Sequence, residues 1–153
     1  MPLMRDLRAH RPQMGGLEAR FAVEAACLPL AAKRRQPAHL RAMRAEIAHQ
    51  RHASLSDEDF CASDVRFHQS VAEATGNCLL AVQAAGVIEA IEPLMNMLTY
   101  RTRDRGVIAE HHAAMADALE RRDAGAAGTA LDAIARYVGE LAAMRIDGAA
   151  ARA

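Results

Sequence analysis

Apolar side chains recur at helical spacing along most of the chain and divide it into six predicted helices. The first begins near Leu17 and continues past Pro29, which we expect to kink it. The second begins at Pro37, a residue that suits the first turn of a helix. The third begins after Ser56, because Ser56 and Asp59 have the spacing of a variant capping box.

Polar residues and a glycine mark the boundaries around the fourth helix. Thr75 and Gly76 should end the third helix, and Asn77 can then cap the fourth. The fourth helix is expected to pass through Pro93 and to end near Tyr100.

Two further helices follow a polar connection at residues 101–106. The last one follows Asp123, and its apolar stripe consists of Ala127, Leu131, Ile134, Val138 and Leu141. We expect residues 1–16 to be a tail, residues 17–147 to form one helical domain and residues 148–153 to fray. The short connections and the absence of a strand pattern predict an all-α fold, an antiparallel bundle of six to seven helices.

Composition supports helices and limits the partners. Aromatic residues make up 3% of the 153 residues and Trp is absent, which disfavours strands. Lys plus Arg balance Asp plus Glu at 19 each, so no net charge attracts nucleic acid or an anionic membrane. The three cysteines lack CxxC spacing, which argues against a disulfide framework. Without a secretion signal or an apolar run of roughly 20 residues, we expect a cytoplasmic protein outside the membrane.

Ionisable residues interrupt two apolar stripes. In the third predicted helix, Asp64 and His68 lie four residues apart on the stripe that also carries Phe67. A buried ionisable group needs a partner, which is either the other member of this pair or a bound ligand. In the fifth helix, His111 and His112 fall on the inward side. Two histidines and one carboxylate can form the first shell of a divalent metal ion, whereas the simpler alternative is an exposed histidine and a second one bonded to a carbonyl.

Basic residues offer a further candidate. Arg20 and Glu24 are four residues apart on the first helix, which fits either an ordinary intrahelical ion pair or an arginine that binds a carboxylate. The arginines of the run at 101–106 are expected to form a solvated loop. No nucleophile motif is present, so we do not expect an enzyme. The alternative is a small metal-dependent hydrolase or hydratase, with Glu110 or His111 as its general base.

Several short runs together resemble the FCD domain, the effector-binding half of FadR-type regulators in the GntR superfamily. In chain order they are Arg20-x-x-x-Glu24, Asp64-Val-Arg-Phe67-His68, Ala74-Thr-Gly-Asn77, Glu110-His111-His112, and then Asp123 and Ala127. The resemblance covers about residues 17–146. It implies a helical bundle that binds a small effector, commonly an organic acid, and that dimerises with a second copy.

The resemblance also implies a ligand set. The metal-binding members use an aspartate and a histidine that match Asp64 and His68, and a later histidine that matches His112 rather than His111. A fourth histidine in those members falls at Ile134, which cannot bind a metal. We therefore expect a three-ligand site for zinc, nickel or manganese, with Arg20 and Asn77 as further effector-binding residues.

The resemblance implies a winged helix-turn-helix of roughly seventy residues ahead of this domain, and residues 1–16 are too few for one. The sequence therefore predicts the effector-sensing, dimerising domain of a transcriptional regulator. We expect it to reach DNA only through another domain or a partner, and not by itself. A third alternative is a purely structural helical dimerisation module, whose interior polar residues satisfy one another.

Overall fold

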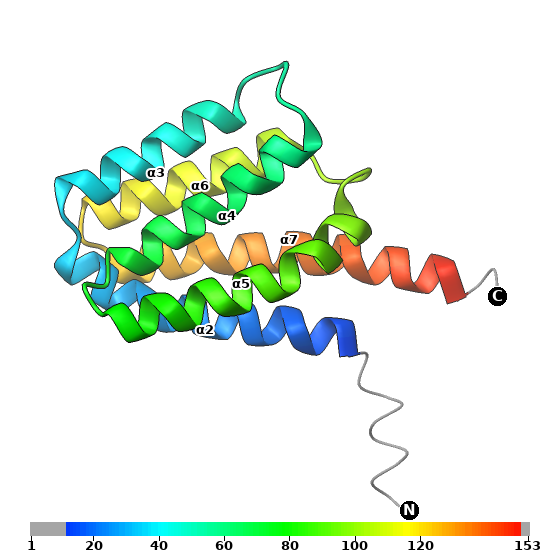
Figure 1. Ribbon diagram of the computed structural model, residues 1–153, viewed down its shortest axis with the longest axis horizontal. Helices are drawn as coiled ribbons and strands as arrows, with labels where there is room; N and C mark the ends of the chain where they lie inside the picture. Colours follow the sequence, from blue (N-terminus) through cyan, green and yellow to red (C-terminus); the bar gives the residue numbers. More distant parts are fainter. Residues whose placement is uncertain (1–11, 151–153) are drawn as a thin grey trace, which may run out of the picture.

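The computed structural model describes residues 12–150, and these residues form six α-helices with no strand among them (Figure 1). The all-α bundle predicted from the sequence is confirmed. The helices are α2 (Pro12–Arg34), α3 (Pro37–Gln50), α4 (Asp57–Glu73), α5 (Cys78–Thr99), α6 (Arg105–Glu120) and α7 (Ala124–Ala150).

The predicted capping residues set several of these boundaries. The Ser56 hydroxyl accepts a hydrogen bond from the Asp59 backbone N–H at 3.0 Å, which fixes the start of α4. Gly76 follows the end of α4 with a φ of +61°, a left-handed conformation that glycine adopts without a steric penalty. Asn77 Oδ1 accepts from the N–H groups of Leu79 and Leu80, each at 3.2 Å, and so caps α5.

The structure extends the first and last helices beyond the predicted domain limits. Helix α2 begins at Pro12, ahead of the predicted start near Leu17, and Pro29 lies inside it without ending it. Helix α7 continues to Ala150, so residues 148–150, which we expected to fray, are helical. The rest of the two predicted tails, residues 1–11 and 151–153, lies outside the described residues.

The six helices close into a ring around one interior. Neighbours in the ring are α2 and α5, α5 and α4, α4 and α3, α3 and α6, α6 and α7, and α7 and α2. The main apolar core contains Phe67, Met115, Leu119 and Leu131, which come from three different helices. Because each helix turns one face inward, a polar residue on any of the six inner faces can meet polar residues from the others.

Helix α5 corrects the expectation that the chain contains no apolar stretch long enough to span a membrane. It is 22 residues long, and its most apolar 18-residue stretch has a mean hydropathy of 1.5, so within residues 12–150 it alone is long and apolar enough to cross a bilayer. A single helix of this kind is weak evidence for a membrane segment, because a core helix of a bundle meets the same criterion.

Candidate metal and effector site

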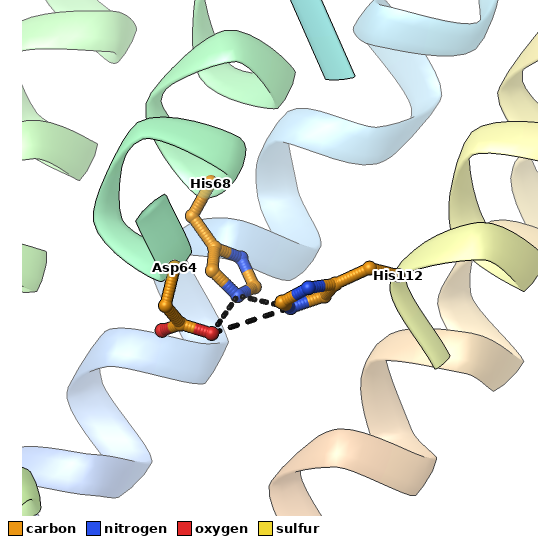
Figure 2. Close-up of side chains that lie close together, drawn as sticks. All are labelled: Asp64, His68 and His112. Atoms are coloured by element: carbon orange, nitrogen blue, oxygen red, sulfur yellow. Dashed lines mark hydrogen bonds and ion pairs between the residues drawn. The ribbon is translucent and has the colours of Figure 1, made fainter. Parts of the chain in front are cut away.

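The three predicted metal ligands, Asp64, His68 and His112, meet inside the ring of helices. His68 Nε2 and His112 Nε2 lie 3.2 Å apart, and Asp64 Oδ1 lies 3.4 Å from His112 Nε2 and 3.9 Å from His68 Nε2 (Figure 2). The i, i+4 spacing in α4 puts Asp64 above His68, and α6 supplies His112 from across the interior. All three side chains are nearly or fully withdrawn from solvent, and His112 is 0% exposed.

The outer nitrogens of both imidazoles are engaged by other side chains. Gln50 Oε1 lies 2.8 Å from His112 Nδ1, and Glu24 Oε1 lies 2.8 Å from His68 Nδ1. Gln50 Oε1 can accept the hydrogen of His112 Nδ1, and the Glu24 carboxylate forms an ion pair with His68. The Nε2 atom of each imidazole is directed toward the other ring and toward Asp64. Such outer partners are typical of metal-binding histidines, because they fix the tautomer and the ring orientation.

Three polar atoms thus converge in a buried space, where a shared proton or a metal ion can satisfy them. Burial lowers the pKa of His112 to about 3, with the nearby charges of His68 and Arg20 adding to the effect, so this ring stays neutral. Burial also opposes protonation of His68, but the charges of Glu24 and Asp64 outweigh it and raise the pKa of His68. The cation between the three atoms is therefore either a proton on His68 or a metal ion.

The spacing of the three atoms fits a first-row divalent ion. Metal–nitrogen bonds of about 2.0–2.1 Å at tetrahedral angles place ligand atoms about 3.3 Å apart. The observed separations of 3.2, 3.4 and 3.9 Å bracket this value. Among the described residues, Asp64, His68 and His112 form the group of histidine, cysteine, aspartate and glutamate side chains that lie close enough together to hold a metal ion. The donor set of two imidazoles and one carboxylate suits zinc, nickel or manganese.

Arg20 lies beside this cluster and connects three carboxylates. Its guanidinium is 3.4 Å from Glu24 Oε2, 3.5 Å from Asp64 Oδ2 and 3.2 Å from Glu92 Oε2, and its side chain is buried. The predicted pair with Glu24 exists, but it is one contact of a buried network and not an isolated surface ion pair. The charges of His68 and Arg20 outweigh burial and lower the pKa of Asp64.

Sequence reasoning missed Glu92, the third carboxylate on Arg20. It lies on the inner face of α5 between Ile88 and Met95, and it is buried. Burial and the charge of Asp64 raise the pKa of Glu92 to about 7. The observation that could have found it is the one that singled out Asp64, namely an ionisable residue on an apolar helical stripe.

A small cavity of about 30 Å³ opens between Arg20, Asp64 and Glu92. Its remaining wall is mainly apolar and includes Ile134 of α7, the position at which the resemblance places a fourth ligand. A volume of about 10–15 Å³ accommodates one water molecule, so this cavity has room for about two. An organic acid can enter only if side chains that line the cavity move.

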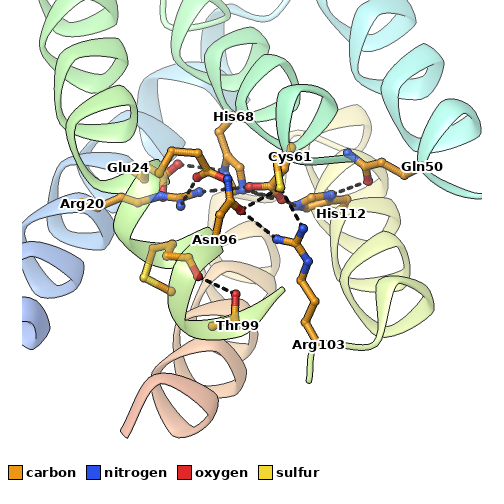
Figure 3. A network of polar contacts seen from close by, with 12 residues as sticks. Arg20, Glu24, Gln50, Cys61, His68, Asn96, Thr99, Arg103 and His112 are labelled. Carbon is orange, nitrogen blue, oxygen red and sulfur yellow. Dashed lines mark hydrogen bonds and ion pairs between the residues drawn. The ribbon is translucent and has the colours of Figure 1, made fainter. Parts of the chain in front are cut away.

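Arg103 corrects the expectation that the arginines of residues 101–106 are solvated. Its guanidinium donates to Asn96 Oδ1 at 3.1 Å and to Cys61 Sγ at 2.8 Å (Figure 3). It also lies over the Phe60 ring, 4.8 Å from the ring centroid. Arg103 also lines the cavity, so a second guanidinium faces the same space as Arg20. No helical period could have predicted these contacts, because Arg103 lies in the connection between α5 and α6.

The other residues proposed from the sequence, His111, Asn77 and Glu110, lie away from the ligand cluster. His112 faces the ligand cluster, whereas His111 is partly exposed and has no atom in it. Asn77 lies at the exposed N-terminus of α5, where its carboxamide caps the helix, and it does not line the cavity. Glu110 is exposed and pairs with Arg51 at 2.7 Å, so neither general base predicted for the hydrolase alternative lines the cavity.

A ring of six helices around a buried polar centre defines a helical ligand-binding domain. The model of the FCD domain family matches residues 16–137, and the chain belongs to this family. FCD domains are the effector-binding regulatory domains of GntR-family transcription regulators, which are generally not enzymes. A comparison with curated protein sequences found no match.

Proposed function

We propose that this domain senses a small organic acid beside a divalent metal ion held by Asp64, His68 and His112. The observation that carries the proposal is the convergence of three buried acceptor atoms, each 3.2–3.9 Å from the others, next to a cavity that contains Arg20. A bound metal would supply positive charge and open coordination positions for a carboxylate. Arg20 would supply a second, geometrically fixed set of donors.

The carboxylates around Arg20 link binding to a change of shape. In the absence of an acid, Glu92 occupies Arg20 at 3.2 Å and helps to fill the space. An incoming carboxylate competes with Glu92 for the guanidinium, because both offer oxygen acceptors to the same N–H donors. Release of Glu92 would shift α5 relative to α2, and this shift is the response that we propose to be passed on. DNA would be reached through another domain or a partner.

Zinc binding by the metal-stripped chain tests the proposed metal. We expect wild-type protein to bind one zinc ion, and we expect His68→Ala to lower the affinity by 100-fold or more, measured by competition with a chromophoric chelator. His111→Ala is the matched control and should retain wild-type affinity. Affinity should fall on acidification, because a proton on His68 competes with the metal and the pKa of His68 is raised. Unchanged zinc affinity in His68→Ala would exclude this site.

The acid is tested on the zinc-loaded and the metal-free protein by thermal-shift screening against small mono- and dicarboxylates. A hit should raise the midpoint, and Arg20→Gln should abolish the response while circular dichroism shows that the helices remain. If no acid raises the midpoint of either form, or if Arg20→Gln responds like wild type, the proposal of an organic acid at this position is wrong.

A further inference from the structure

Arg103 brings to the cavity beside Arg20 a positive charge that no carboxylate within residues 12–150 contacts. Both guanidinium groups line this cavity, and Arg20 meets three carboxylates there. The partners of Arg103 among the described residues are uncharged, namely the Asn96 carboxamide, the Cys61 thiol and the Phe60 ring. We propose that the effector is a dicarboxylate, with one carboxylate on Arg20 and the other on Arg103, and that Arg103 selects it over monocarboxylates.

The Arg103 guanidinium also retains a donor for a further ligand. Its Nε atom is buried and has no hydrogen-bond partner among residues 12–150, while its two terminal nitrogens bond to Asn96 and Cys61. A buried donor without an acceptor is costly, and native structures contain few of them. A carboxylate is the acceptor that suits a guanidinium best, because its two oxygens match two N–H groups of the planar fork. The unpaired charge and the unpaired donor therefore both indicate an anion.

Uncharged contacts hold Arg103 in position before any ligand arrives (Figure 3). Asn96 Oδ1 accepts from Nη1 at 3.1 Å, and Cys61 Sγ accepts from Nη2 at 2.8 Å. The Cys61 thiol in turn donates to Asn96 Oδ1 at 2.8 Å, so the two partners of the guanidinium also bind each other. Because this side chain is already ordered, a ligand that binds it loses less affinity to the cost of ordering.

Helix α5 sets the spacing between the two guanidinium groups. Glu92 contacts Arg20 and Asn96 contacts Arg103, and these two residues of α5 are four apart, or about 6 Å along the helix. The Glu92 carboxylate, 3.2 Å from Arg20, occupies the position that we assign to the first carboxylate of the ligand. When Glu92 leaves, a short dicarboxylate of the size of succinate can reach from one guanidinium to the other.

The charges at the centre favour a dianion as well. This step rests on the proposed function, because it counts a divalent metal ion bound by neutral histidines. The metal, Arg20 and Arg103 then carry four positive charges, and Asp64 and Glu24 carry two negative ones. Glu92 adds no charge when it is protonated, and burial raises its pKa to about 7. Two positive charges remain, which one dicarboxylate neutralises and one monocarboxylate does not.

Isothermal titration calorimetry of the zinc-loaded chain with succinate and butyrate tests the proposed selectivity. These acids have four carbon atoms each and differ in one carboxylate, and both are titrated at pH 7 and equal ionic strength. Wild type should bind succinate about tenfold or more tightly than butyrate, because charge-assisted hydrogen bonds are worth at least that factor. Arg103→Gln should bind butyrate as wild type does and should bind the two acids within about threefold of each other. Arg103→Lys keeps the charge and should keep a preference for succinate, whereas a merely structural role of Arg103 would weaken both acids equally.

Arg101→Gln is the matched control. It removes the same charge from the same connection, but Arg101 is exposed, bonds to the Tyr100 hydroxyl and does not line the cavity. This variant should discriminate between the two acids as wild type does. Zinc affinity, measured by chelator competition, should be unchanged in all three variants, and circular dichroism should show the same helical content.

Three results would overturn the assignment of a dicarboxylate to Arg103. Wild type that binds butyrate as tightly as succinate would do so while leaving a metal-assisted organic acid in place. Arg103→Gln that keeps the full preference for succinate would also do so, and it would leave the dicarboxylate without this anchor. If wild type binds neither acid, the assignment fails and the thermal-shift screen decides separately whether any acid binds. The wild-type comparison requires no variant, so it holds even if Arg103→Gln does not fold.

Discussion

Individual residues at the centre of the bundle determine which atoms can bind a cation. Gln50 and Glu24 come from different helices, yet each places an oxygen 2.8 Å from Nδ1 of one imidazole, while the Nε2 atoms face the ligand cluster. Glu24 carries a charge, because the charges of His68 and Arg20 outweigh burial and lower its pKa. The two histidines are thus unequal, and His68 is the one on which a proton and a metal ion compete.

Ile134 should determine how tightly a metal is held. This side chain is buried and lines the same cavity as Asp64, so Ile134→His directs a fourth ligand toward the site. We expect the substitution to raise zinc affinity by about tenfold or more, since closed four-ligand sites bind more firmly than open ones. Chelator competition measures this change. Arg136→His, on the exposed side of α7, is the control, and an equal affinity in both variants would show that Ile134 does not face the metal.

Glu92 should make the stability of the metal-free domain depend on pH. The ordinary pKa of this group is 4.5, and burial in the folded chain raises it to about 7. Between these values the unfolded chain loses the proton while the folded chain keeps it, so Glu92 destabilises the fold increasingly as pH rises through this window. Glu92→Gln removes this effect. Its free energy of unfolding relative to wild type should therefore increase by roughly 1–3 kcal/mol as the pH rises from 4.5 to 7.5.

Urea unfolding with a chelator present, repeated across that pH range, measures the difference between the two proteins. The control is Glu89→Gln, an exposed residue on the outward side of the same helix, which should show no comparable change. A difference between Glu92→Gln and wild type that stays constant with pH would mean that Glu92 is already ionised in the folded chain.

At the scale of elements, short-range capping contacts fix where the helices begin, and they lie apart from the ligand cluster. Ser56, Asn77 and Asp104 each accept backbone N–H groups at the start of a helix. Asn77 illustrates the difference between the two roles, because the resemblance implied a ligand-binding residue and the structure shows a cap. Its side-chain oxygen is already engaged by two N–H groups.

Replacement of Asn77 distinguishes these roles. Asn77→Ala should cost about 1 kcal/mol of unfolding free energy, because the first N–H groups of α5 lose their acceptor. Asn77→Ser retains a capping oxygen and should recover most of this loss. Chemical denaturation of both variants gives the comparison. The response to any acid found by thermal shift should be unaffected, and an acid response lost in both variants would return Asn77 to the binding site.

At the scale of the whole molecule, closure of the ring brings all six helices to one site. Each contributes at least one residue: Arg20 and Glu24 from α2, Gln50 from α3, Asp64 and His68 from α4, Glu92 from α5, His112 from α6 and Ile134 from α7. The same closure leaves α5 in the wall, with Glu92 on its inner side and the exposed side chains of Leu79, Val82 and Met97 on its outer side.

The sequence by itself determined the features that depend on neighbours along the chain. Helical periodicity, capping residues and the i, i+4 placement of Asp64 and His68 require only the geometry of one helix, and the structure confirms them. The FCD resemblance also rested on local runs of residues and agrees with the family match. The choice of His112 over His111 came from that resemblance, and the position of His112 in the ligand cluster agrees with it.

Only the tertiary structure decided which inner faces meet. Gln50, Glu92 and Arg103 are polar residues on three separate segments, and no spacing along the chain relates them to Asp64. Their proximity results from the packing order of the helices, which depends on side-chain fit across the interior and not on the period of any one helix. For the same reason the apolar positions of α5 could be assigned to a helix from the sequence, but not divided into a buried side and an exposed one.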